Sequence, residues 1–143
     1  MKRTGFVFLS MLVAAGVSLA ADPAPQAPVV QAPKETPELL EKGKAAYLVN
    51  CLACHGEKGD GAGPAGQALN PKPRDFSKDP FKQGTKPEEL FKSISEGVAG
   101  TPMIGYAHLP EEDRWGLTYY VLSFVPKNAK GAPAPKKPAP AKK

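Results

Sequence analysis

Two cysteines and a histidine stand close together in this chain of 143 residues and could bind a metal or a cofactor. Cys51, Cys54 and His55 form the pattern C-x-x-C-H. Two thiols at this spacing on a helical turn can add to the two vinyl groups along one edge of a porphyrin. The histidine that follows is then carried under the iron, where its ring nitrogen can serve as an axial ligand. The pattern predicts covalent attachment of one c-type haem.

The same residues allow other interpretations. A disulfide between Cys51 and Cys54 would close a loop too small to hold the domain together. A thioredoxin-like redox pair is expected in a βαβ setting, which the sequence lacks. A zinc site would need four ligands, for which His108 is the other available histidine, but the spacing differs from that of zinc fingers. Covalent haem is the preferred interpretation among these.

Met103 is the predicted ligand on the opposite side of the iron. It is the one methionine left when residues 1–20 are removed, and it lies in a segment without helical pattern, GVAGTPMIGYAHLP. A thioether favours ferrous iron and raises the reduction potential relative to a second imidazole. In the absence of a haem, a lone methionine most often packs in a core. His108 is the rival ligand and would give a bis-histidine haem of lower potential.

Neither end of the chain is expected to belong to the folded unit, and the first residues predict export. Residues 1–20 combine two basic residues, an uncharged stretch and a small-residue cleavage pattern, which predicts a signal peptide; an uncleaved anchor is the alternative. We therefore expect a periplasmic or otherwise exported protein with no stable membrane insertion after cleavage. Residues 21–34 form a Pro/Ala-rich linker, and residues 127–143 a disordered Pro/Ala/Lys-rich tail that either solubilises the protein or docks to an anionic surface.

The positive charge of the chain is concentrated at its ends. The formal net charge is +5. Without residues 1–20 and the six lysines of residues 127–143, 11 basic residues remain against 14 acidic ones, a net charge of −3. A nucleic-acid-binding domain would carry its basic patch on the fold, so we expect no nucleic-acid partner.

Three helices must position these ligands within residues 35–126. The first is capped by Thr36, begins at Pro37 and leads directly into Cys51. The second begins at Thr85, with Glu88 completing a capping box. The third begins at Pro110 and stops at Pro126. The residues on their apolar faces are Leu39, Gly43, Tyr47 and Asn50; Leu90, Phe91, Ile94 and Val98, before Gly97 and Gly100; and Trp115, Leu117, Tyr120, Val121 and Phe124.

The rest of this unit is largely loop. No stretch alternates apolar and polar residues as a strand would, so the fold class is all-α. Residues 57–84 are rich in glycine and proline, and a loop of this length is unusual in a small domain. Such a domain has a weak apolar core by its own means. A cofactor is expected to fill its centre.

The order of these motifs resembles that of the small soluble class I cytochromes c of bacteria. The resemblance covers residues 35–125 and rests on the segments Gly43-x-x-x-Tyr47, Cys51-x-x-Cys54-His55, Gly61-x-Gly63-Pro64, Gly100-Thr101-Pro102-Met103 and Trp115-x-Leu117-x-x-Tyr120-Val121. It implies the class I cytochrome c fold, with three main helices and long loops around one covalent haem.

The resemblance also implies a role for individual residues. Cys51 and Cys54 would form the thioethers, and His55 and Met103 would be the axial ligands of a His/Met-ligated mono-haem centre. The residues implied around these are Pro64, whose carbonyl would accept a hydrogen bond from His55; Arg74, which would reach a haem propionate; Gly43 and Tyr120 at the crossing of the first and third helices; and Leu52, Ala53, Ala62 and Ile104 around the exposed haem edge.

The implied function is electron transfer rather than catalysis. With both axial positions taken, the protein would carry single electrons between transient redox protein partners by outer-sphere transfer, and it would not be an enzyme. One alternative is a haem-based gas sensor or peroxidase-like enzyme with a displaceable Met103. Another is an electron-transfer subunit of a larger oxidoreductase, docked through the tail.

Overall fold

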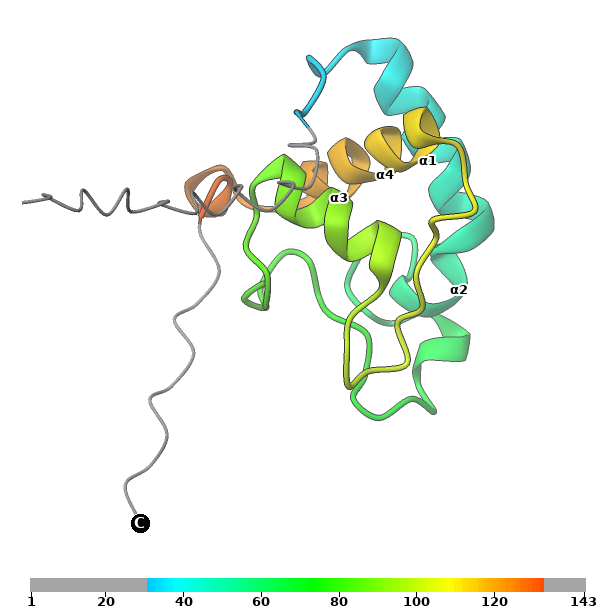
Figure 1. Ribbon diagram of the computed structural model, residues 1–143. Coiled ribbons are helices and arrows are strands. Elements are labelled where there is room, and N and C mark those ends of the chain that lie inside the picture. The colour runs from blue at the N-terminus through cyan, green and yellow to red at the C-terminus, as the bar shows by residue number, and fades with distance from the viewer. Residues whose placement is uncertain (1–30, 133–143) are drawn as a thin grey trace, which may run out of the picture.

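The computed structural model describes residues 31–132, and every regular element in this part of the chain is helical (Figure 1). The elements are α1 (Pro37–Asn50), α2 (Leu52–His55), η1 (Pro64–Gly66), α3 (Pro87–Glu96), α4 (Glu111–Phe124) and η2 (Lys127–Ala129). The expected all-α class is therefore confirmed. The predicted signal peptide, residues 21–30 of the predicted linker and residues 133–143 of the predicted tail lie outside the described residues. Within residues 31–132, no helix combines the length and apolar character needed to cross a membrane.

The first helix begins as the sequence predicts, but the second does not. The Leu39 amide donates to Thr36 Oγ1 at 3.2 Å, so Thr36 caps α1. Helix α3 starts at Pro87, and the Lys86 amide donates to Glu89 Oε2 at 3.3 Å. The prediction that Thr85 caps this helix is therefore wrong. The Thr85 hydroxyl donates instead to the Ala129 carbonyl, so it does not cap α3.

The ends of α3 and α4 are set by glycine and proline. Gly97 follows α3 with a φ of 79°, a left-handed value that glycine adopts without strain. Val98, which the apolar pattern assigned to this helix, consequently lies in the following loop. Helix α4 starts directly after Pro110 and ends one residue before Val125, close to the predicted stop at Pro126.

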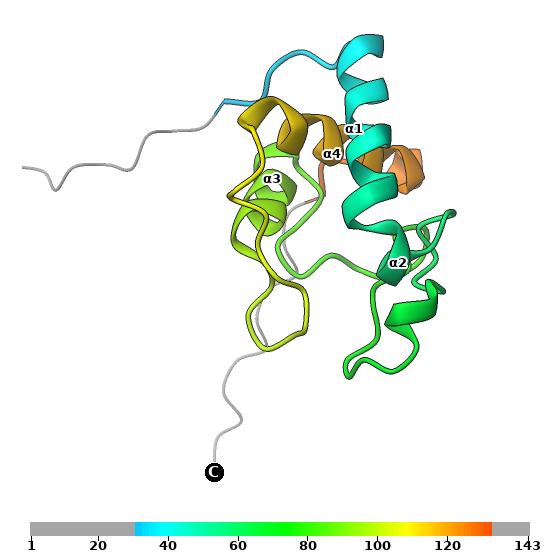
Figure 2. The same ribbon diagram turned by 90° about the vertical axis from the view of Figure 1, so that its right-hand side faces the viewer.

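Helices α1 and α4 cross at a pair of glycines (Figure 2). A Cβ added at Gly43 would lie 1.9 Å from the carbonyl oxygen of Gly116, so the two backbones touch. Gly43 is at the crossing as expected, and its partner is Gly116. Tyr120 also lies between these two helices, where it packs edge-on against the Tyr47 ring of α1, with centroids 5.2 Å apart.

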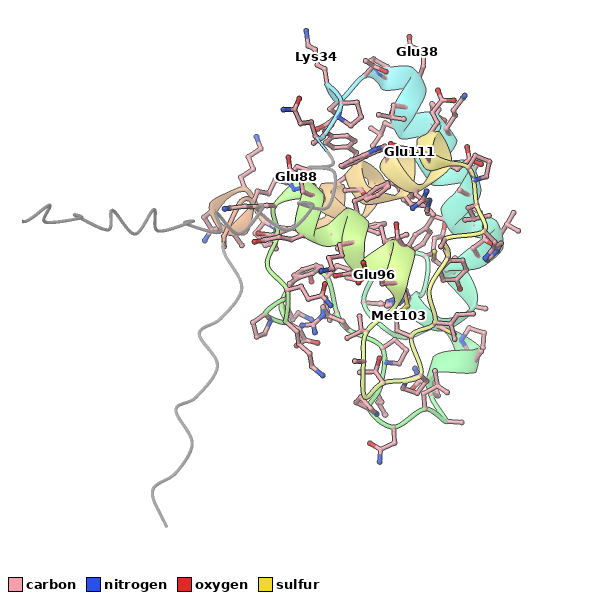
Figure 3. The ribbon with its side chains drawn as sticks, in the orientation of Figure 1. Lys34, Glu38, Glu88, Glu96, Met103 and Glu111 are labelled. Carbon is pink, nitrogen blue, oxygen red and sulfur yellow. The ribbon has the colours of Figure 1, made fainter. Side chains whose placement is uncertain are left out.

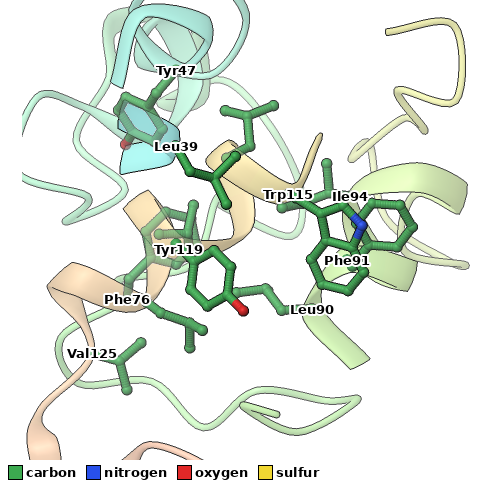
Figure 4. Packing of buried hydrophobic residues seen from close by; sticks show 12 residues of the cluster. Leu39, Tyr47, Phe76, Leu90, Phe91, Ile94, Trp115, Tyr119 and Val125 are labelled. Carbon is green, nitrogen blue, oxygen red and sulfur yellow. The ribbon is translucent and has the colours of Figure 1, made fainter. Parts of the chain in front are cut away.

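The apolar core lies between the long helices (Figure 4). Helix α3 packs against α4 through the stacked rings of Phe91 and Trp115, whose centroids are 4.0 Å apart. The buried apolar residues are Leu39, Tyr47, Phe76, Leu90, Phe91, Ile94, Trp115, Leu117, Tyr119, Val121, Leu122 and Val125. All but Phe76 belong to α1, α3, α4 or the residue that ends α4, so the loops of residues 56–86 and 97–110 add little to this core.

Both chain ends of the described part pack onto the helical unit. The Tyr119 hydroxyl donates to the Pro33 carbonyl. At the other end, residues 127–132 form a turn that pairs with Thr85. The Thr85 amide donates to the Ala132 carbonyl at 2.8 Å, and the Gly131 amide donates to the Thr85 carbonyl at 3.2 Å. This C-terminal turn, residues 127–132, therefore holds the end of the loop that precedes α3.

Candidate cofactor site

A cavity of about 720 Å³ lies beside the helices and among the long loops. Its volume falls in the range of ~300–1,000 Å³ that is usual for ligand sites. Residues from α1, both long loops, α3 and α4 contribute to its wall. Five of the six predicted site residues line it: Cys51, Cys54, His55, Arg74 and Met103.

The two cysteines enter the cavity from the joint between α1 and α2. Cys51 ends α1, where its amide donates to the Tyr47 carbonyl at 2.9 Å. Its own carbonyl then accepts from the His55 amide at 2.8 Å, so the next helical turn starts at once. Both thiols are free and partly exposed to the cavity. The structure therefore contains no disulfide between them.

Burial perturbs the Cys51 thiol. It raises the pKa of Cys51 to about 12, and the neighbouring Cys54 acts in the same direction. At neutral pH the thiol is thus in its protonated form. Addition of a thiol to a vinyl group consumes both the sulfur and its proton, so this form carries the atoms that thioether formation needs.

Two tyrosine hydroxyls hold the main chain on either side of Cys51. The Tyr47 hydroxyl donates to the Gly56 carbonyl at 2.7 Å, which ties α1 to the residue after His55. The Tyr106 hydroxyl donates to the Asn50 carbonyl at 2.9 Å, which ties the loop before α4 to the end of α1. Tyr47, Asn50 and Tyr106 all line the cavity. The spacing and rigidity of the C-x-x-C-H turn therefore depend on contacts from outside it.

Glycines bring the following loop against α2. A Cβ added at Gly63 would lie 2.5 Å from the Ala53 carbonyl oxygen, and one at Gly66 would lie 2.5 Å from that of Cys54. The turn that starts at Pro64 is thereby pressed against the main chain of α2. Pro64 does not line the cavity. The hydrogen bond expected from His55 to its carbonyl is not formed, because Nδ1 of His55 is buried and has no partner among the described residues.

His55 faces an aromatic ring instead. Its imidazole stacks on the Phe76 ring, with centroids 4.6 Å apart and planes at 20°. Burial lowers the pKa of His55. The main chain of Arg74 raises this pKa in part, although it makes no hydrogen bond of regular geometry with Nδ1. The positive charge of Arg74 lowers the pKa further. The neutral imidazole, which is the form that binds a metal, is thus favoured.

Met103 reaches the cavity from the loop between α3 and α4 (Figure 3). The loop is folded back on itself, since the Val98 amide donates to the Met103 carbonyl at 3.1 Å. Thr101 braces this turn: its hydroxyl donates to the Val98 carbonyl at 2.7 Å and accepts from the Met103 amide at 3.2 Å. His108 is exposed beside the Tyr106 ring and does not line the cavity.

Three basic side chains line one part of the cavity: Lys72, Arg74 and Lys82, together with Asp79. The Arg74 guanidinium lies over the Phe81 ring, 5.2 Å from its centroid, and burial lowers its pKa. A role is predicted for Arg74 from the sequence, but for neither lysine. The same segment, residues 70–76, also contains Phe76. An aromatic residue in a proline-rich loop is the sequence signal that could have identified Phe76.

The chemistry of this cavity fits a haem. Its wall is mostly apolar, it presents two free thiols at the required spacing, and it has an imidazole and a thioether as donors. The zinc alternative lacks its ligands, because no three His, Cys, Asp or Glu side chains among residues 31–132 form a metal-binding group.

Comparisons with known proteins agree with this chemistry. Residues 38–121 match the family model described as cytochrome c oxidase, cbb3-type, subunit III. Among solved structures, the chain is similar to a chain of the reducing HAO-like protein complex of Kuenenia stuttgartiensis, with 33% identity and a TM-score of 0.62. The match covers 74% of the present chain and 50% of that chain, so the present sequence spans about half its length. No curated protein matches the sequence.

Proposed function

The chain belongs to the cbb3-type cytochrome c oxidase subunit III family of c-type cytochrome domains, and on this premise we propose that it carries single electrons between redox proteins through one covalently bound haem c. It is a small cytochrome c of all-α fold, and its role is haem-based electron transfer.

The observation that carries the proposal is the meeting of Cys51, Cys54, His55 and Met103 at one cavity. In this proposal Cys51 and Cys54 would hold one haem through thioether bonds, and His55 and Met103 would be the ligands of its iron. When bound, the haem supplies a one-electron Fe(III)/Fe(II) couple. With these two ligands the iron would have no open position for a substrate, and the protein would transfer electrons rather than catalyse a reaction.

The chain's own residues would orient and solvate the group. The brace from Thr101 to Met103 limits how far the thioether can move, which favours a bond that survives both oxidation states. Arg74, Lys72 and Lys82 offer positive charge to the propionates. Ile104 is 65% exposed at the rim of the same cavity, and transient redox partners would approach there.

A second candidate is an electron-transfer subunit of a larger oxidoreductase. The favouring observation is that the solved neighbour is a chain of a protein complex and is about twice as long as the matched part. The basic tail, whose residues 127–132 pack against Thr85, would then dock to an anionic surface of the partner. In either case we propose that residues 1–20 direct export, with the domain in the periplasm or otherwise outside the cytoplasm.

The ligand assignment is tested by optical spectra of three haem-loaded proteins: the wild type, Met103→Ala and His108→Ala. We expect the far-red methionine-to-iron charge-transfer band of the ferric wild type to be lost in Met103→Ala and kept in His108→Ala. Carbon monoxide should leave the reduced wild type unchanged, because the sixth position is filled. A band that persists in Met103→Ala would refute the assignment, and rapid carbon monoxide binding would favour the gas-sensor alternative.

A further inference from the structure

No hydrogen bond of regular geometry among the described residues fixes the plane of the His55 ring. The Arg74 main chain lies close enough to raise the pKa of His55 but makes no such bond. The His55 main chain is well anchored, because its carbonyl accepts from the Gly61 amide at 2.9 Å. The ring itself has a buried Nδ1 without a partner. Rotation of an imidazole about its Cβ–Cγ bond has broad minima, so an anchored backbone alone leaves the ring plane free. Some other contact must select it.

The Phe76 ring is the contact that does so. It lies face to face with the imidazole at 4.6 Å, and it is 8% exposed. A ring stacked at 20° leaves the imidazole free to slide but opposes its rotation out of the plane. Of the aromatic pairs in residues 31–132, this is the one that includes His55.

Phe76 is itself held firmly. Its amide donates to the Gly59 carbonyl at 2.7 Å. Its ring stacks on Phe81 at 5.8 Å and on Phe124 of α4 at 6.2 Å. Gly59 has no side chain to displace these rings, since a Cβ there would lie 2.8 Å from Phe76. The Phe76 ring, and with it the His55 imidazole, is therefore held in a fixed position relative to α4.

We infer that Phe76 is a positioning residue that sets the plane of the His55 imidazole through this stack. The inference rests on the proposed function insofar as His55 is an iron ligand. In a low-spin ferric haem, the plane of an axial imidazole directs the unpaired spin over the porphyrin and thereby sets the order of the haem methyl NMR shifts. The role of Phe76 is thus visible in a property other than electron-transfer activity.

The test uses the full chain loaded with haem, as wild type, Phe76→Leu, Phe76→Trp and Phe81→Leu. We expect Phe76→Leu to change the spread and order of the haem methyl shifts, and Phe76→Trp to restore them toward the wild-type pattern. Phe81→Leu is the matched control: it removes a ring that stacks on Phe76 but does not touch His55, and the bond to Gly59 and the Phe124 ring still hold Phe76, so the wild-type order should persist. An unchanged order in Phe76→Leu, or an equal change in Phe81→Leu, would overturn the inference.

A second measurement separates this inference from the proposed function and serves if Phe76→Leu fails to fold. The chain has two histidines, so a spectrum of histidine-labelled, haem-free full chain contains two imidazoles, and His108→Gln assigns them. The ring protons of His55 should lie upfield in the wild type and further upfield in Phe76→Trp. A His55 signal that is insensitive to residue 76 contradicts the inference. If the wild type does not attach haem, the proposed function is contradicted. The haem-free histidine spectrum then still shows whether Phe76 stacks on His55.

Discussion

The side chains around the C-x-x-C-H turn are held by groups distant in sequence rather than by the turn. Tyr47 reaches over Cys51 to the Gly56 carbonyl, Tyr106 reaches back to Asn50, and Phe76 covers the His55 ring. The two tyrosine hydroxyls donate to main-chain carbonyls at the ends of helices. Carbonyls at such ends lack a partner within the helix and otherwise bind water or a capping group. The reactive groups are thereby presented with little freedom.

At the residue scale, the buried Cys51 thiol predicts a pH-dependent stability of the haem-free chain. The usual thiol pKa is 9.0, and burial raises that of Cys51 to about 12. Between these values the unfolded thiol loses its proton while the folded one keeps it, so the folded state binds more protons and stability falls as pH rises from 9 to 12. Urea unfolding at pH 7.5 and pH 10 should therefore show a larger loss in the wild type than in Cys51→Ser. Equal losses of stability in the two proteins would show that a group other than Cys51 causes the pH dependence. Burial also raises the pKa of Tyr47, but Tyr47 is present in both proteins and cancels in the comparison.

At the scale of elements, α1 and α4 can cross closely because neither has a side chain at the contact. A Cβ at Gly116 would meet the Gly43 nitrogen and the Leu39 carbonyl oxygen, both at 2.7 Å. Above this crossing, the Lys42 ammonium and the Glu112 carboxylate pair at 2.7 Å on the surface. The crossing determines where α4 places Leu117 and Val121, which line the cavity.

Gly43→Ala should therefore destabilise the haem-loaded protein strongly. The added methyl group cannot be accommodated unless the helices separate, and overpacking of this kind costs about 1–3 kcal/mol or more. Lys44→Ala, an exposed change on the same helix, is the matched control and should alter stability little. Chemical denaturation followed by circular dichroism measures both. A Gly43→Ala protein as stable as the control would mean that the helices do not pack as closely as described.

The pairing of Thr85 with the C-terminal turn also belongs to the scale of elements. The Thr85 hydroxyl donates to the Ala129 carbonyl and accepts from the Ala132 amide at 2.9 Å. Thr85→Val keeps the shape but removes these bonds of the hydroxyl; because Ala129 is half-buried and Ala132 exposed, the cost is about 0.5–1.5 kcal/mol. We expect faster hydrogen exchange at Gly131 and Ala132. Thr85→Ser retains the hydroxyl and should exchange as the wild type does, so equal acceleration in both variants would contradict the role of the hydroxyl.

Across the whole molecule, α1 and α4 begin close together, because Lys42 pairs with Glu112, whereas α3 ends beside the start of α4, where Arg114 donates to Ser95. Acidic residues occupy the first turns of α1, α3 and α4, where the helix dipole favours them: Glu38, Glu88, Glu89, Glu111, Glu112 and Asp113. The cavity wall instead carries Lys72, Arg74 and Lys82 against Asp79. The cavity wall thus offers net positive charge to an anionic edge of a cofactor.

A cavity of about 720 Å³ in so small a domain predicts that stability depends on what fills it. A double variant, Cys51→Ala with Cys54→Ala, cannot form thioethers. Its haem-free form should unfold at a clearly lower temperature than the haem-loaded wild type, because the apolar wall loses its contacts; a ligand present at a thousand times its Kd alone contributes about 4 kcal/mol. Circular dichroism during heating measures the difference. Coincident unfolding curves would mean that the helical core is self-sufficient.

The sequence by itself determined the elements whose causes are local. The all-α class, the Thr36 cap, the proline at the start of α1 and the glycine after α3 follow from neighbouring residues, and the structure confirms each of them. Thr85 shows the limit, since a local rule assigned it to a helix cap and a partner more than forty residues away claims its hydroxyl.

Only the tertiary structure decided which distant groups meet. The Gly43–Gly116 contact, the stack of Phe76 on His55 and the absence of His108 from the cavity wall depend on how the loops close around the helices. Loop paths are set by many weak long-range contacts, and a single chain of residues contains no local pattern for them. The chemistry of the C-x-x-C-H turn is therefore legible in the sequence, whereas the orientation of its imidazole is a property of the folded molecule.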